Sequence, residues 1–206
     1  MIFYTHDKGS ANLKLENYAT VRSGLVLSRK RSDTGEGVNY PLLTLRAIRS
    51  QGLIDADELD EYWANERLSN EYVSCIGDII VRLTAPYTAV LIDENTQGMV
   101  ISSNFVIIRT DQSILSADYL YWLLNTKKLK YKIYENSTSN MLGAVKSRYF
   151  SELPIKLIPL DEQLKIADMN KLAKKEQHLL YKLAQEKEKY YTYIIDKFQK
   201  EVRQHD

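Results

Sequence analysis

The C-terminal part of this sequence is a long segment without glycine or proline. From Asp161 to about Arg203 nothing interrupts a helix, because these two residue types are the strongest helix breakers. Asp161 and Glu162 begin the segment, and acidic side chains in a first turn oppose the positive end of the helix dipole. Such a helix extends roughly 60 Å, which exceeds what a compact domain covers. We therefore expect a domain over residues 1–160 and a separate long helix over residues 161–206.

Apolar side chains recur along this segment at heptad spacing. They follow two adjacent tracks, as in the seam of a coiled coil, although glutamates interrupt both tracks. A single helix needs a partner to bury such a stripe, so the sequence predicts dimerisation through the helix. A helix folded back on its own domain is the alternative. The predicted dimerisation residues are Met169, Leu172, Leu179, Leu183, Tyr190, Tyr193 and Ile194.

The preceding residues alternate short apolar runs with turn residues, which predicts an α+β domain with a mixed or antiparallel β-sheet. Pro41 favours an edge position for its strand, because proline cannot donate to a neighbouring strand. The acidic segment 55–68 fits either a helix or a loop, and Trp63 within it is expected to pack. Ser116 is a good N-cap for the helix that follows it. Strands are predicted at 15–21, 40–45, 72–83, 88–92, 100–101, 104–108 and 155–158.

Charge is distributed unevenly along the 206 residues, although the formal net charge is only +1. Residues 8–49 contain eight basic and three acidic residues, whereas residues 50–78 contain one basic and eight acidic residues. Residues 127–206 are basic again, with 17 basic and 11 acidic residues. The pattern fits a basic face on a balanced domain, and it fits a solvated surface equally well.

Polar loops between the predicted strands supply candidates for contact with nucleic acid. The segment 28–39 holds three consecutive cations between flexible residues, and arginine reads base edges while lysine holds phosphate. The tyrosines and lysines of 127–136 are interpreted instead as the rim of an amphipathic helix. The candidate DNA-binding residues are Arg29, Lys30, Arg31, Arg46, Arg49, Arg82, Thr84, Tyr87, Ser139, Asn140, Lys146 and Arg148.

Residues for catalysis are hard to find in this sequence. It contains neither an Asp-x-Lys nor a Glu-x-Lys nuclease signature, and neither an Asn-Pro-Pro-Tyr motif nor a Gly-x-Gly-x-x-Gly loop. Its three histidines and Cys75 show no metal-ligand spacing. We therefore expect no enzyme activity, no metal and no cofactor on this chain. It shows neither a signal peptide nor a membrane-length apolar run, and a cytoplasmic location is expected.

Three short motifs resemble the target-recognition domain in specificity (S) subunits of type I restriction-modification systems. The family's domain closes with a Gly loop, an apolar Pro strand and a Pro-Leu-x-Glu-Gln turn into a long helix. The matching residues are Gly143, Leu153-Pro154-Ile155, Pro159-Leu160-Asp161-Glu162-Gln163 and Ile166; Gly77-Asp78-Ile79-Ile80-Val81-Arg82; and Tyr18-Ala19-Thr20-Val21 with Gly24. The sequence departs from the family at Ala85-Pro86, where a glycine is usual.

This resemblance implies a DNA-sequence reader without an active site of its own. Full-length members usually carry two recognition domains and two long helices, so this chain looks like a half-subunit. Two copies are expected to pair their helices antiparallel and to read an interrupted palindrome. The partners implied are double-stranded DNA, a methyltransferase (M) subunit that uses S-adenosylmethionine and an ATP-driven restriction (R) subunit.

Two other interpretations remain open at this point. The chain is either an interaction module whose helix assembles a complex without DNA, or a cassette that pairs with a different half-subunit and reads an asymmetric site. Steep loss of DNA affinity with salt and a preference for one sequence would argue against the interaction module. The sequence does not predict which bases are read.

Overall fold

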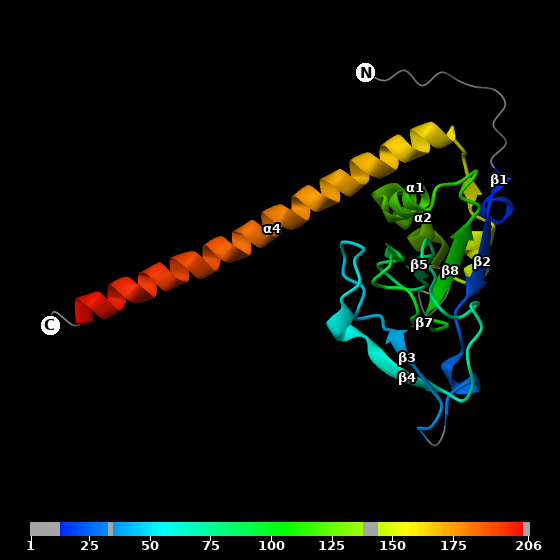
Figure 1. The fold of residues 1–206 in the computed structure, drawn as a ribbon. Helices are drawn as coiled ribbons and strands as arrows, with labels where there is room; N and C mark the ends of the chain where they lie inside the picture. The colour runs from blue at the N-terminus through cyan, green and yellow to red at the C-terminus, as the bar shows by residue number, and fades with distance from the viewer. Residues whose placement is uncertain (1–12, 33–34, 138–143, 204–206) are drawn as a thin grey trace. The chain divides into compact units, whose positions relative to one another are not determined.

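The computed structural model describes residues 13–32, 35–137 and 144–203 and is drawn in Figure 1. The chain divides into two compact units, residues 1–164 and residues 165–206. The first unit is the α+β domain, and the second continues the long C-terminal helix. The fold class predicted from the sequence is confirmed.

Four strands of the domain form an antiparallel sheet in the order β2-β8-β5-β6. Its two central strands bury consecutive side chains, and these point to opposite faces of a sheet. Both faces of this sheet are therefore covered. The strands are β2 (Ala19–Ser23), β8 (Phe105–Thr110), β5 (Ile79–Arg82) and β6 (Ala89–Leu91).

A second sheet has three strands in the order β4-β3-β7. β3 (Val38–Leu43) pairs antiparallel with β4 (Asp60–Ala64) and parallel with β7 (Val100–Ile101). The predicted edge position of the Pro41 strand is therefore wrong, since β3 is the middle strand. The β7 pairing involves only Leu42 and Leu43, so Pro41 is paired on one side alone and its missing N–H breaks no ladder.

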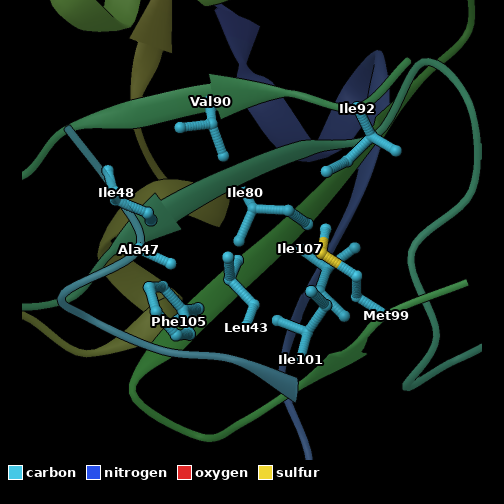
Figure 2. Packing of buried hydrophobic residues seen from close by; sticks show 10 residues of the cluster. All are labelled: Leu43, Ala47, Ile48, Ile80, Val90, Ile92, Met99, Ile101, Phe105 and Ile107. Atoms are coloured by element: carbon cyan, nitrogen blue, oxygen red, sulfur yellow. The ribbon is translucent and has the colours of Figure 1, made fainter. Parts of the chain in front are cut away.

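Buried side chains from the two sheets meet in one core, shown in Figure 2. Leu43 from β3 lies among Ile80 of β5 and Ile107 of β8. Each fully buried aliphatic side chain stabilises the fold by about 1.5–3 kcal/mol. The core consists of Leu43, Ala47, Ile48, Ile80, Val90, Ile92, Met99, Ile101, Phe105 and Ile107.

The opposite face of the three-stranded sheet packs in a second cluster. Leu42 and Val100, the neighbours of Leu43 and Ile101, point this way because side chains alternate along a strand. Tyr62 and Ala64 of β4 are buried in the same cluster, whereas Trp63 between them is 38% exposed. Trp63 is therefore not the packing residue that we expected.

The acidic segment 55–68 is neither a helix nor a simple loop. It contains the short 3₁₀ turn η3 (Ala56–Glu58), followed by strand β4. Asp60 and Glu61 face solvent on β4. An edge strand with charged outer positions resembles a loop in composition, so composition alone does not predict this strand.

Several predicted strands are shorter than expected. Leu15–Asn17 forms a 3₁₀ turn (η1), and residues 72–76 are irregular before β5 begins. The run 155–158 contributes only β9 (Pro154–Ile155), which pairs antiparallel with β1 (Leu13–Lys14). Strands at 100–101 and 104–108 are present as β7 and β8, but they belong to different sheets.

Helices cover the four-stranded sheet and close the domain. α1 packs against β6, and α3 packs against β2. The predicted N-cap is confirmed, because the Ser116 hydroxyl accepts a hydrogen bond from the Tyr119 N–H at 3.4 Å. The helices are α1 (Ala117–Asn125), α2 (Lys127–Ser137), α3 (Ser147–Ser151) and α4 (Leu160–Arg203), with a further 3₁₀ turn η2 at Leu27–Arg29.

Candidate nucleic-acid interface

Gln163, the last residue of the Pro-Leu-Asp-Glu-Gln turn, anchors the start of α4 to the domain. Its side chain is 0% exposed. The side-chain oxygen accepts the Ser116 N–H at 2.9 Å, and the amide nitrogen donates to the carbonyls of Ile114 at 3.0 Å and Ile158 at 2.9 Å. A buried amide with satisfied hydrogen bonds fixes the direction of the chain where the helix begins.

Asp78, from the Gly-Asp motif, forms a buried ion pair with Arg109 of β8. The carboxylate is 2% exposed and accepts the Arg109 Nε at 2.7 Å and Nη2 at 3.0 Å. It also accepts the Cys75 N–H at 2.8 Å, while Arg109 donates to the Asn70 carbonyl at 2.6 Å. The hydrogen bond to Asp78 raises the pKa of Arg109. The pair ties the irregular segment before β5 to the sheet.

Gly24 marks the point where the chain leaves β2 and meets β7. A Cβ atom there would lie 2.2 Å from the Ser102 carbonyl oxygen and 2.4 Å from that of Ile101. Both atoms belong to the backbone and cannot swing away. Only glycine fits this approach, so the motif residue has a structural role in joining the two sheets.

The loop after β5 brings several predicted contact residues together. Thr84 bridges to Ala144, and the Val145 N–H donates to the Leu83 carbonyl at 2.8 Å. Lys146 follows directly and is exposed. We name this group the β5 loop site. Its candidate contact residues are Arg82, Thr84, Lys146 and Arg148.

Side chains within and next to the β5 loop site differ in their burial and in their hydrogen-bond partners. Arg82 is half-buried, its Nε has no hydrogen-bond partner among the described residues, and burial lowers its pKa. Arg148 is exposed and pairs with Glu152 at 3.0 Å. Tyr87 is 3% exposed and its hydroxyl donates to the Ser137 hydroxyl at 2.6 Å. Tyr87 therefore supports the loop from within, and its predicted role as a surface contact is corrected.

The three consecutive cations lie along the outer side of β4. Arg31 bridges to Ala64, and the Asn65 N–H donates to the Lys30 carbonyl at 2.9 Å. Lys30 pairs with Glu66, and the hydrogen bond to that carboxylate raises the lysine pKa. Arg29 and Arg31 are exposed and have no carboxylate partner in the part of the chain that the structure describes.

Arg46 and Arg49, by contrast, are held by the acidic segment. Arg46 pairs with Glu58 at 3.0 Å and also with Asp60, and Arg49 pairs with Asp55. The hydrogen bonds to Asp60 and Asp55 raise the pKa values of Arg46 and Arg49, and Arg49 lowers that of Asp55. Both guanidinium groups are thus largely neutralised by their neighbours.

The segment that carries these two arginines is also fixed to α1. The buried Tyr121 hydroxyl donates to the Gly52 carbonyl at 3.1 Å, and burial raises the pKa of Tyr121 to about 12. The position of Arg46 and Arg49 therefore follows from the scaffold as well as from their ion pairs.

Two surface residues near these cations escaped the sequence analysis. Trp63 is exposed on β4, and Arg67 is exposed after it and forms no ion pair with another described residue. The alternation of β4, with Tyr62 and Ala64 buried, is the signal that would have placed Trp63 outside. Ser139 and Asn140 lie outside the described residues.

The predicted dimerisation residues lie on α4 and are almost all exposed. Met169, Leu172, Leu179, Leu183, Tyr190 and Tyr193 are each more than half exposed, and Ile194 is half-buried. Within the described ranges, no helix is long and apolar enough to cross a membrane, and no group of three or more potential metal ligands is present.

Solved structures with the same fold identify its architecture. One is a chain from a study of complex assembly and conformational transition of the type I R-M system, with a TM-score of 0.64 and 18% identity over 85% of this chain. The other is the HsdS subunit from Thermoanaerobacter tengcongensis, with a TM-score of 0.59 and 19% identity over 83% of this chain. The fold is that of a type I specificity subunit. The resemblance inferred from the motifs is thus confirmed at the level of the fold.

This chain spans less than half the length of those two neighbours, 45% of the first and 43% of the second. No protein-family model matches the sequence. No curated protein matches it significantly either.

Proposed function

We propose that this chain is a non-catalytic, sequence-specific DNA-binding specificity subunit. In this role it directs partner methyltransferase and endonuclease subunits to a bipartite site. The observation that carries the proposal is the fold shared with the HsdS subunit over 83% of the chain. The buried bonds of Gln163 and Asp78 add support, because they give the resemblance motifs structural roles in that fold.

The surface that meets DNA combines the β5 loop site with the edge beside β4. Arg29 and Arg31 have no competing carboxylate among the residues that the structure describes, so they can gain from contact with phosphate or a base edge. Arg82 would likewise find an acceptor in a DNA complex for its Nε, which has no hydrogen-bond partner in the described part of the chain. Trp63 adds an exposed aromatic surface on the neighbouring strand. Arg46 and Arg49 contribute less, because their ion pairs must break before they can bind.

The same proposal includes an antiparallel homodimer of half-subunits through α4. Two copies of a chain that covers 45% of a solved neighbour have about the length of one such neighbour. Uncovered leucines and tyrosines along α4 supply an apolar seam for a second copy. A twofold dimer would carry two identical recognition domains and read an interrupted palindrome.

Replacing Leu179 and Leu183 with Glu tests this dimer. The double variant should be a monomer by light scattering, because two buried carboxylates would face the partner helix. A matched control replaces Gln177 and Ala184 with Glu. These two residues lie one heptad apart outside the seam, and this variant should remain a dimer. A dimer that survives the seam substitutions would contradict helix pairing.

Chemistry in this system belongs to the partners. Adenine methylation requires S-adenosylmethionine on the methyltransferase subunit, and cleavage requires ATP on the restriction subunit. We assign no catalytic residue, metal or cofactor to this chain, and we place the assembly in the cytoplasm.

The methylome of an unmethylated host tests the proposal directly. The chain is co-expressed with the methyltransferase subunit encoded beside it, and modified adenines are mapped by sequencing. An interrupted palindrome supports both the specificity role and the symmetric dimer. An asymmetric bipartite motif supports the role and replaces the homodimer with a mixed one. Folded, associated proteins that give no methylation would favour a protein-interaction module without DNA recognition.

A further inference from the structure

A groove between helices α1 and α2 and the β9 segment is a largely apolar surface cavity of the domain. It has a volume of about 410 Å³. Its apolar lining includes Leu123 of α1, Leu129 of α2, Ile155 of β9 and Ile158. We name it the α2–β9 groove. Its volume falls within the range of pockets that take up apolar groups.

Three lysines surround this apolar floor. Lys128 and Lys132 lie one turn apart on α2, and Lys156 directly follows β9. All three are exposed. None has a carboxylate partner among the described residues, although other lysines of the chain, such as Lys30 and Lys189, do. The groove thus combines an apolar centre with an uncompensated positive rim.

We propose that the α2–β9 groove binds an acidic amphipathic helix of a partner protein. Helix-in-groove recognition places apolar side chains of one helix face into such a floor. Carboxylates that flank this face would meet the rim lysines, and complementary charge selects the partner. The inference stands on the groove alone and does not depend on DNA recognition.

Other occupants fit the groove less well. A DNA backbone has phosphates for the lysines but offers little to the apolar lining that includes Leu129 and Ile155. A second copy's α4 carries ten basic and eight acidic residues, so its charge does not complement the rim. In the domain, α1 and α2 also lie away from β3 and β4 (Figure 1), whereas Arg31 bridges to Ala64 of β4.

Synthetic peptides of about 20 residues supply a defined probe, because this length is sufficient for an amphipathic helix. The first carries a leucine stripe flanked by glutamates. The second replaces each glutamate with lysine, and the third keeps the glutamates but replaces leucine with serine. Fluorescence anisotropy with the full chain measures their affinities. The acidic leucine peptide should bind at least about tenfold more tightly than either of the others.

Charge reversal in the protein locates the site. The double substitution Lys128→Glu with Lys132→Glu should lower the affinity for the acidic peptide by about tenfold or more. The same substitution should raise the affinity for the lysine peptide. Lys127→Glu is the matched control, since it precedes these residues on α2 but does not line the groove. Circular dichroism confirms that each variant is folded.

Three results would overturn the inference. The first is no binding of the acidic peptide up to about 1 mM. The second is binding that the Lys128 and Lys132 substitutions leave unchanged. The third is a variant that loses as much affinity for a DNA duplex as for the acidic peptide, together with a wild-type chain that shows no preference among the three peptides. This result would assign the lysines to phosphate contact.

Discussion

Two motif residues, Gln163 and Asp78, and two proposed DNA contacts, Arg29 and Arg31, occupy opposite environments in the same domain. Gln163 and Asp78 are buried and fully hydrogen-bonded, so each has one conformation. Arg29 and Arg31 are exposed and lack a carboxylate partner within residues 13–32, 35–137 and 144–203, so their charge is not offset there and their side chains are not held. The comparison teaches that the buried motif residues stabilise the fold. The proposed contacts with DNA are made instead by exposed side chains that the fold does not hold in place. Substitutions in the two groups should therefore separate stability from DNA affinity.

The largest effect is expected for Asp78→Ala. Removing the carboxylate leaves the Cys75 N–H and the Arg109 Nε without their acceptor, which should lower the free energy of unfolding by about 3 kcal/mol. Urea unfolding followed by circular dichroism measures the change. Asp78→Asn is the matched control, because it keeps the shape and one acceptor, and it should lose less. Equal stability of the alanine variant and the wild type would show that Asp78 is not a scaffold residue.

Gln163→Ala should come next, with a loss of about 2 kcal/mol. The substitution removes the hydrogen bonds that join the start of α4 to Ser116, Ile114 and Ile158. The same unfolding experiment measures it. Gln177→Ala lies on an exposed position of α4 and should be neutral. If both variants behaved alike, the anchor would lie elsewhere.

Arg29→Ala with Arg31→Ala should affect binding and leave folding unchanged. The affinity for the specific duplex should fall by about tenfold, and the slope of affinity against salt should become shallower. Fluorescence anisotropy at several salt concentrations gives both values, and light scattering should show an unchanged oligomer. Unaltered binding would remove this segment from the interface.

Arg46→Ala with Arg49→Ala is the sharpest comparison and should have the smallest effect. These arginines are already paired with Asp55, Glu58 and Asp60, so less than about a threefold loss of DNA affinity is expected. A loss that equals that of the Arg29 and Arg31 variant would mean that the ion pairs open on binding. The two arginine pairs would then be equivalent.

Part of the fold was predictable because it depends on local signals. The absence of glycine and proline predicted α4, and Ser116 predicted the start of α1. The acidic strand β4 was missed, since its charged outer positions hide the buried Tyr62 and Ala64. Pairing between β7 and β3, which are distant in the chain, has no local signal at all.

The sequence predicted which basic residues could belong to the candidate site, but it did not predict which of them form ion pairs. Arg29, Arg31, Arg46 and Arg49 look alike in the sequence, where all four belong to one basic region. Only the fold brings Asp55, Glu58 and Asp60 to two of them. Tyr87 shows the same limit, because its burial follows from packing of the β5 loop against Ser137.

By itself, then, the sequence determined the long helix, its heptad stripe, the α+β class and the positions of the scaffold motifs. These depend on backbone propensity and on residue spacing, which neighbouring residues define. The tertiary structure alone decided which cations remain free, which aromatic side chain is exposed on β4 and where an apolar groove opens beside α2. Such properties depend on contacts between segments far apart in the chain, and charge or burial is settled only when those segments meet.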